Sequence, residues 1–310
     1  MSKKIIFMGT PYFAVPILKS LYQNGYVISV VYTQPPKKSD RGQKINKSPV
    51  QVMSETLNLD FRTPHTLKNN FEEYEYLKKL KADLGIVVAY GQIIPKEFLK
   101  LCNKGFINIH GSILPKWRGA APIQRSIMNL DKEIGISIMK IVEKLDVGPV
   151  CNIYKINLDT NENAQVVSEK LSLLAAEKIL YNIDEIFQDK AKFTDQDHSK
   201  ATYAEKIKKK EGRIDWSQKA PIIIAKINGL YPSPSAFFIF NGERYKILRA
   251  EVAKGIGKVG EVISDKLEIA CGENQSIKIL EIQREGKRPQ NINEFAFGSQ
   301  IKKGTVIPNV

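Results

Sequence analysis

The first hundred residues alternate between short apolar runs and segments with helical spacing. Lys4–Met8 and Val27–Tyr32 are β-branched, apolar runs that predict buried strands. Between them, the apolar residues of Phe13–Asn24 recur with the period of a helix face. Two further strands are predicted at Leu84–Ala89 and Phe106–His110. This strand–helix–strand order predicts an α/β domain with a doubly wound, mostly parallel sheet.

The turn after the first predicted strand argues against a dinucleotide site. Gly9 is the only glycine in the segment that follows this strand. The dinucleotide fingerprint needs several glycines, because the backbone must approach a pyrophosphate closely. A nicotinamide or flavin cofactor is therefore not expected.

The pattern changes in the last third of the chain. Residues 166–187 form a long amphipathic stretch, predicted as a helix, and residues 188–210 are polar and weakly periodic, as a linker is. Short apolar runs then alternate with turn residues, which is typical of a small β-barrel. The runs are Ala236–Phe240, Tyr245–Leu248, Gly260–Ser264, Leu267–Ala270 and Ile277–Ile282. We predict a catalytic domain over residues 1–189, a linker over 190–208, and an OB-like barrel over 209–310.

Charge adds a hint about partners. The chain has 310 residues and a formal net charge of +14. Residues 200–310 carry 20 basic and 12 acidic residues, a net of +8 in about a third of the chain. A basic balance of this kind suits a polyanionic partner, although it also serves solubility alone.

The cysteine positions and the hydropathy pattern indicate the cellular compartment. Cys102, Cys151 and Cys271 stand far apart, with no CxxC pair and no histidine cluster nearby. A disulfide framework or a zinc site is therefore not expected. No signal-peptide pattern and no apolar run near 18 residues is present, so we expect a cytoplasmic protein that does not enter a membrane.

Two polar residues mark the carboxyl end of a predicted strand. Alternate residues of a strand face the same side, so Asn108 and His110 share one face. Polar side chains on a buried strand are costly unless they are paired or functional, and ligands of open α/β sheets bind beyond the carboxyl ends of the strands. The alternative is a structural histidine that anchors the following loop.

A candidate partner follows the next strand candidate, residues 135–142. Asp146 lies in a loop bounded by Gly148 and Pro149. Taken alone, this aspartate is better explained as a turn former or helix cap. A loop leaving the sheet at the same edge would instead bring Asp146 against His110.

These residues carry a family resemblance. Asn108-Ile-His110 followed by Gly-Ser-Ile-Leu-Pro, with a later Leu-Asp-x-Gly, resembles the folate-dependent formyltransferases. Further segments resemble the methionyl-tRNA formyltransferase family specifically: Trp117–Gln124, Gly9–Pro11 with Phe13-Ala14, Thr33–Pro35, Val88–Gly91, Thr202–Lys206 and Arg213–Ser217. The resemblance runs from about residue 4 to residue 250. Lys144 and Val147 depart from it, because the family usually has Gly and Thr at these positions.

The resemblance implies a reaction and a set of site residues. The formyl donor would be 10-formyltetrahydrofolate, the acceptor would be the amino group of initiator methionyl-tRNA, and no metal would be needed. Asn108 would donate to the oxyanion, His110 would handle protons, and Asp146 would orient His110. The residues implied to line the folate site are Tyr90, Gly91, Ser112, Ile113, Leu114 and Pro115. A monomer is expected.

A basic insertion follows the second strand. Residues 34–49 contain five positive residues, Lys37, Lys38, Arg41, Lys44 and Lys47, and one negative residue. Such a segment is ordinarily a solvated loop, and its few apolar residues predict little order without a partner. The resemblance implies instead that this loop enters the acceptor end of tRNA, with phosphate contacts positioning the RNA.

Three other functions compete with this interpretation. A formyltransferase acting on a small amine, such as glycinamide ribonucleotide or an amino sugar, would need neither the basic second domain nor the basic loop. A deformylating hydrolase could use the same three residues. A non-catalytic RNA-binding module would leave Asn108, His110 and Asp146 unexplained.

Overall fold

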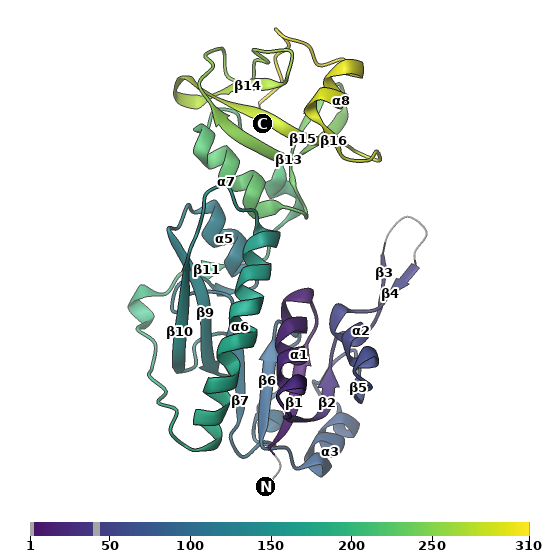
Figure 1. Ribbon diagram of the computed structural model, residues 1–310, viewed down its shortest axis with the longest axis vertical. Helices are drawn as coiled ribbons and strands as arrows, with labels where there is room; N and C mark the ends of the chain where they lie inside the picture. Colours follow the sequence, from purple (N-terminus) through teal and green to yellow (C-terminus); the bar gives the residue numbers. More distant parts are fainter. Residues whose placement is uncertain (1–2, 40–43, 310) are drawn as a thin grey trace. The chain divides into compact units, whose positions relative to one another are not determined.

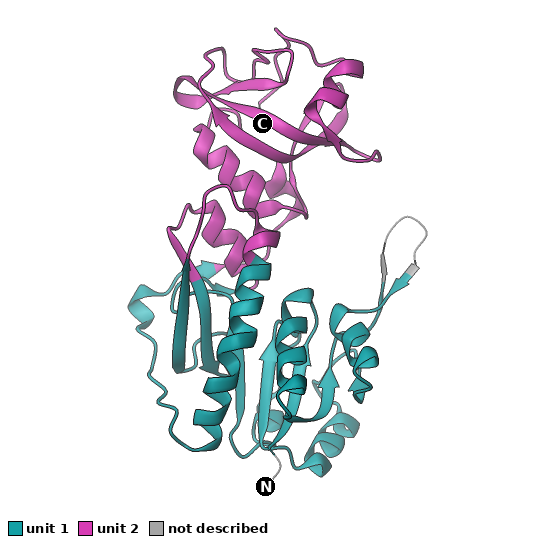
Figure 2. Ribbon diagram, viewed as in Figure 1, with its two compact units in different colours: residues 1–119, 135–156, 168–203 teal, residues 120–134, 157–167, 204–310 magenta. Residues whose placement is uncertain are grey.

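The computed structural model describes residues 3–39 and 44–309, which form two compact units (Figure 2). Unit 1 comprises residues 1–119, 135–156 and 168–203. Unit 2 comprises residues 120–134, 157–167 and 204–310. Of the positions singled out from the sequence, Arg41 lies outside the described residues.

Unit 1 is organised around a seven-stranded sheet (Figure 1). Its strands are β1 (Lys4–Gly9), β2 (Val27–Tyr32), β5 (Phe61–Arg62), β6 (Leu84–Val88), β7 (Phe106–His110), β9 (Glu133–Lys140) and β10 (Val150–Asn157), in the spatial order β10-β9-β7-β6-β1-β2-β5. The β5, β2, β1, β6 and β7 strands run parallel, whereas β9 pairs antiparallel with β7. This confirms the predicted mostly parallel α/β sheet.

Helices cover both faces of this sheet. On one face, α1 (Val15–Gln23) lies beside α6 (Ala164–Phe187), and the Ser20 hydroxyl donates to the carbonyl of Ala176 (Figure 1). On the other face, α3 (Phe71–Leu80) and α4 (Lys96–Leu99) pack on a buried cluster. That cluster contains Ile6, Met8, Val30 and Tyr32 from the strands, and Leu77 and Phe98 from the helices. Odd and even residues of the same strand thus bury against different helices, as alternation requires.

The basic insertion contains more backbone structure than its composition suggests. β3 (Lys37–Ser39) and β4 (Lys44–Asn46) pair antiparallel, in a register that sets Lys38 opposite Ile45. The helix α2 (Pro49–Thr56) follows, and the Ser48 hydroxyl caps it by accepting from the Gln51 amide at 2.9 Å. This hairpin was not predicted from the sequence, because backbone pairing needs no buried side chains.

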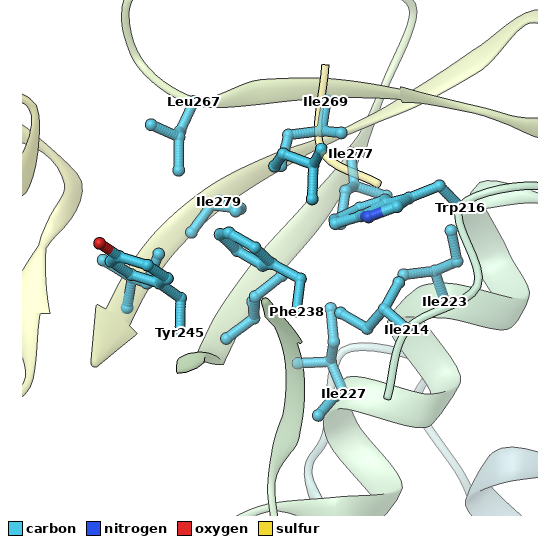
Figure 3. Packing of buried hydrophobic residues seen from close by; sticks show 14 of the residues in the cluster. Ile214, Trp216, Ile223, Ile227, Phe238, Tyr245, Leu267, Ile269, Ile277 and Ile279 are labelled. Carbon is cyan, nitrogen blue, oxygen red and sulfur yellow. The ribbon is translucent and has the colours of Figure 1, made fainter. Parts of the chain in front are cut away.

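Unit 2 contains an antiparallel sheet wrapped around its own core. The strands β12 (Ala236–Phe240), β13 (Glu243–Ala253), β15 (Gln275–Arg284) and β14 (Glu268–Cys271) are neighbours in that order, and β16 (Gln290–Asn291) pairs with β15. Bridges from Val262 to Ile269 and from Glu261 to Val306 extend the sheet. Trp216, Phe238 and Tyr245 fill the interior beside isoleucines of β14 and β15 (Figure 3). This architecture is that of a small barrel, as predicted.

Several helices of unit 2 were not predicted. The α5 helix (Pro122–Met128) packs against α7 (Ala220–Leu230) at Gly229, where a Cβ would lie 2.6 Å from the Met128 side chain. The remaining short elements are α8 (Ile292–Gly298), β8 (Arg118–Gly119), β11 (Tyr203–Ala204), η1 (Tyr12–Ala14), η2 (His198–Lys200), η3 (Lys209–Gly212) and η4 (Gly272–Asn274). Within residues 3–39 and 44–309, no helix is long and apolar enough to cross a bilayer.

Candidate active site

The structure brings His110 and Asp146 together at the end of β7. The His110 Nδ1 atom lies 3.7 Å from Asp146 Oδ2, and both side chains are more than nine-tenths buried. The distance exceeds that of a direct hydrogen bond, so the carboxylate acts on the ring through its charge. This is the juxtaposition that the two strand ends predicted.

A backbone carbonyl fixes the orientation of the imidazole. The His110 Nε2 atom lies 2.9 Å from the carbonyl oxygen of Trp117. A carbonyl can only accept, so this hydrogen bond assigns a proton to Nε2. In the neutral ring, Nδ1 then presents its lone pair toward Asp146. When the ring is charged, Nδ1 presents a proton instead.

The loop that contains Asp146, called here the Asp146 loop, is held in place by contacts with other segments of unit 1. The Gly119 amide donates to Asp146 Oδ2 at 2.9 Å, and Asp146 itself has a left-handed backbone with φ +53°. A Cβ on Gly148 would lie 1.9 Å from the carbonyl oxygen of Lys140, at the end of β9. These bonds use the backbone and carboxylate, and not the side chains of Lys144 or Val147. The two departures from the family pattern therefore lie outside these contacts.

Asn108 supplies a polar group on the same face of β7. The residue is half-buried, pairs with Met139 of β9 and lies two positions before His110. Among the described residues, its side-chain amide has no hydrogen-bond partner. Its NH₂ group is therefore available as a donor to a ligand.

The turn proposed for the folate is rigidly supported. Ser137 of β9 lies opposite His110; its hydroxyl donates to the carbonyl of Ser112 at 2.7 Å and accepts from the Leu114 amide at 3.0 Å. The Ser112 hydroxyl donates to the Lys116 carbonyl at 2.6 Å. One buried serine thus ties the turn to the strand that faces the histidine. Ile113 and Pro115 belong to the same turn.

Tyr90 and Gly91 form a second backbone feature. The Tyr90 side chain belongs to the buried cluster beneath α3 and α4, where burial and the nearby Glu73 carboxylate raise its pKa above the ordinary tyrosine value. Its carbonyl accepts from the Thr10 hydroxyl and from the Gln34 amide, and Gln34 also donates to the Gly91 carbonyl. Gly91 has φ +80° and no room for a Cβ against Gln34. Any ligand contact here would therefore come from the backbone and not from the phenol ring.

The basic residues of the insertion are partly described. The Lys37 ammonium donates to Gln34 Oε1 at 2.6 Å, and Lys47 pairs with Glu55 at 2.8 Å. Lys38 and Lys44 lie on opposite strands of the hairpin. Both pairings of Lys37 and Lys47 are exposed, and exposed pairs contribute little stability and exchange readily for a phosphate.

Three residues outside the predicted set hold this site together. They are Ser137, which supports the turn, and Arg118 and Gln196, which support the Asp146 loop. Their role depends on backbone carbonyls and amides brought together by the fold. The polar composition of residues 188–210 gave no signal for Gln196. Within the described part of the chain, no group of three or more His, Cys, Asp or Glu residues could hold a metal ion.

Comparison with known proteins gives the class. The formyl transferase family model matches residues 3–182, and the model of the formyl transferase C-terminal domain matches residues 206–300. The chain therefore belongs to the formyl transferase family and is an enzyme of formyl transfer, as the sequence analysis predicted.

Relatives that match over the full length indicate which kind of formyl transferase this chain resembles. Methionyl-tRNA formyltransferase of Pelagibacter ubique (strain HTCC1062) is 68% identical over 310 residues and covers 100% of both chains. Methionyl-tRNA formyltransferase of Chelativorans sp. (strain BNC1) is 40% identical over 310 residues, covering 98% of this chain and 99% of the relative. These relatives bear out the predicted resemblance to the methionyl-tRNA formyltransferases.

Solved structures share the fold. The sugar 3N-formyl transferase WlaRD, in the presence of dTDP and 5-N-formyl-THF, superposes with a TM-score of 0.67 at 19% identity, covering 93% of this chain and 100% of that one. Methionyl-tRNA formyltransferase from Clostridium thermocellum superposes with a TM-score of 0.57 at 20% identity, covering 80% of this chain and 92% of that one. Both support the fold assignment.

Proposed function

We propose that Asn108, His110 and Asp146 transfer the formyl group of 10-formyltetrahydrofolate to the α-amino group of initiator methionyl-tRNA. The product is N-formylmethionyl-tRNA, which serves translation initiation. The observation that carries this proposal is the buried His110–Asp146 pair, with its 3.7 Å separation, beside the free amide of Asn108. The full-length similarity to methionyl-tRNA formyltransferases supports the choice of acceptor.

The reaction needs a base, an oxyanion donor and a proton for the leaving group. The neutral amine attacks the formyl carbon, and the carbonyl π electrons move to oxygen to form a tetrahedral oxyanion. The bond from carbon to N10 of the folate then breaks, N10 takes a proton, and the attacking nitrogen loses one. No redox step is involved, so proton handling and oxyanion stabilisation are the tasks of the protein.

The side chains divide these tasks. The Asn108 amide donates to the oxyanion, and one such donor is typically worth ~10²–10³ in rate. His110 transfers the proton, and general acid–base catalysis is typically worth ~10²–10⁴. For Nε2 to pass its proton to the substrate, the ring must exchange the Trp117 carbonyl, now at 2.9 Å, for the substrate atom that accepts the proton. The Asp146 carboxylate stabilises the positive charge that His110 acquires.

The folate is held by the backbone of two turns. Ser112, Ile113, Leu114 and Pro115 line it from one side, and Tyr90 and Gly91 from the other. The turn of residues 112–115 is supported because its bonds to Ser137 exist before any ligand binds. A preformed turn loses little conformational entropy on binding. No residue of this mechanism requires a metal.

The tRNA is held by the basic hairpin and the C-terminal domain. Lys37, Lys38, Arg41, Lys44 and Lys47 contact the acceptor end, and the net +8 of residues 200–310 attracts the RNA backbone. The division into residues 1–189, 190–208 and 209–310 is part of this proposal. The enzyme acts as a monomer in the cytoplasm, away from membranes, and light scattering during gel filtration measures the oligomeric state.

The decisive experiment compares acceptors. The purified enzyme is given 10-formyltetrahydrofolate with methionyl-tRNA, glycinamide ribonucleotide or an amino sugar nucleotide, and release of tetrahydrofolate is followed. Of the three acceptors, we expect turnover only with methionyl-tRNA. Faster turnover with a small amine would replace the proposed acceptor. Formyl loss to water at the same rate without any acceptor would favour a hydrolase.

A further inference from the structure

A buried glutamine connects the Asp146 loop to an arginine. The Gln196 Nε2 atom donates to the carbonyl oxygens of Asp146 at 2.9 Å and Gly148 at 2.8 Å. Its Oε1 atom accepts from Nε and Nη2 of Arg118 at 3.1 and 2.7 Å. Gln196 is 8% exposed and Arg118 is 3% exposed. All four hydrogen bonds are therefore shielded from water.

The chemistry of the partners permits one orientation of this amide. Arginine offers donors alone, and a backbone carbonyl accepts alone. Flipping the Gln196 amide would set its NH₂ group against the Arg118 guanidinium and its oxygen against two carbonyl oxygens. Arg118 is itself fixed, because its Nη2 lies 2.9 Å from His198 Nδ1 and its backbone amide donates to Thr202. Gln196 is thus a rigid link and not an adjustable one.

The loop that Gln196 holds needs such a link. Asp146 has φ +53°, a left-handed conformation that is strained for a residue with a side chain. The side chains of Lys144 and Val147 make none of the bonds that hold Asp146. Gln196 bonds both carbonyls that flank Val147, and the carboxylate that faces His110 leaves the same short loop.

We propose that Gln196 is a positioning residue for formyl transfer, acting through Asp146. Its two donated hydrogen bonds hold the Asp146 backbone so that the carboxylate faces His110. This inference rests on the proposed catalytic role of Asp146. Gln196 is buried, and its amide is bonded to the Asp146 loop and to Arg118. We therefore expect its loss to lower kcat and to leave the binding of folate and tRNA nearly unchanged.

The test uses Gln196→Glu in the full-length enzyme. This variant keeps an oxygen for Arg118 but removes both N–H donors to the loop. We expect kcat to fall by about tenfold to a hundredfold, because small displacements of catalytic groups carry penalties of this size. The KM for each substrate should stay within about twofold. Asn182→Asp is the matched control, since Asn182 is a fully buried amide of α6 that bonds Asn152 and Tyr154.

A second variant separates positioning from folding. Gln196→Met removes all four hydrogen bonds without adding charge. Its kcat is measured below the unfolding temperatures of the variant and the wild-type enzyme, and is divided by the folded fraction from circular dichroism. If Gln196→Glu does not fold, Gln196→Met supplies the same comparison. A normal kcat per folded Gln196→Met enzyme, or an equal kcat loss in Asn182→Asp, would overturn the inference.

The double variant identifies the route. If Gln196 acts through Asp146, then Gln196→Met should add little to the kcat loss of Asp146→Asn. Losses that multiply would show that Gln196 acts elsewhere. Near-normal turnover in Asp146→Asn would remove the proposed function of the aspartate. Inactive Asp146→Asn beside fully active Gln196→Met would remove only the role of Gln196.

Discussion

Substituting Gly148 with alanine tests whether the position of the Asp146 loop controls the reaction. The added Cβ would lie 1.9 Å from the Lys140 carbonyl oxygen and 3.0 Å from the carbon of the same group. An ordinary contact is about 3.5 Å, so the loop and the end of β9 must separate by roughly 1.5 Å. The obstacle is backbone, which cannot move aside as a flexible side chain can.

The loop has little freedom to absorb this displacement. The Lys140 amide donates to the Pro149 carbonyl at 2.9 Å, and Gln196 donates to the Gly148 carbonyl at 2.8 Å. Separating these groups weakens both bonds and moves Asp146, two residues away. Overpacking of this kind typically costs about 1–3 kcal/mol of stability. A 1 Å error in a catalytic group can cost about a hundredfold in rate.

We therefore expect Gly148→Ala to lower kcat by about a hundredfold and the unfolding free energy by about 1–3 kcal/mol. The KM for folate should change little, because the turn of residues 112–115 is tied to Ser137 and not to this loop. Initial rates with both substrates and urea denaturation measure these quantities. Gly298→Ala is the control, since a Cβ there meets nothing within 4 Å. A folded Gly148→Ala enzyme with normal kcat would show that the position of the Asp146 loop does not control the reaction.

Three further predictions follow from the site and from unit 2. Alanine at His110 or at Asn108 should each lower turnover by about two orders of magnitude with an unchanged thermal transition, and normal rates in both would remove their roles. Arg41→Ala should raise the KM for methionyl-tRNA and flatten its salt dependence, with unchanged folate affinity by fluorescence titration; equal losses for both substrates would place the loop in the folate site. In unit 2, the Ser217 hydroxyl and other donors lower the pKa of Asp215 below its ordinary value. A lowered pKa stabilises the folded state above the unfolded pKa, so this contribution should be lost as pH falls below about 4, and Asp215→Asn should flatten that loss in urea denaturation. An unchanged pH slope in that variant would contradict the assignment.

The sequence predicted those elements that are marked by a pattern of side chains within the element itself. The bounds of β2 and β7 agree with the apolar runs that predicted them, because β2 is rich in β-branched residues and β7 is largely buried. The α7 helix was missed because Ile222, Ile223 and Ile224 are β-branched and its buried surface is broad, so no polar face marks its period. The antiparallel direction of β9 was also beyond the sequence, since strand direction depends on the connection and not on composition.

The candidate site divides along the same line. Asn108, His110 and Asp146 could be named because strand ends and a family resemblance single them out. Gln196 could not, because it bonds backbone carbonyls, and any residue type in the Asp146 loop would present them. A side chain that bonds backbone groups has no partner of a particular residue type, so the sequence does not reveal the pairing. Such positions become visible only when the fold brings the two segments together.

The discontinuity of unit 2 limits how the C-terminal region can be separated from the rest. Its residues 120–134 supply α5, and Met128 of that helix fills the space beside Gly229 of α7. A fragment that begins at residue 204 would expose this helix surface to water, with Ala225 and other apolar residues of α7 near it. Such a fragment would therefore tend to aggregate through this apolar surface. A separable fragment would have to carry a helix equivalent to α5 along with the barrel.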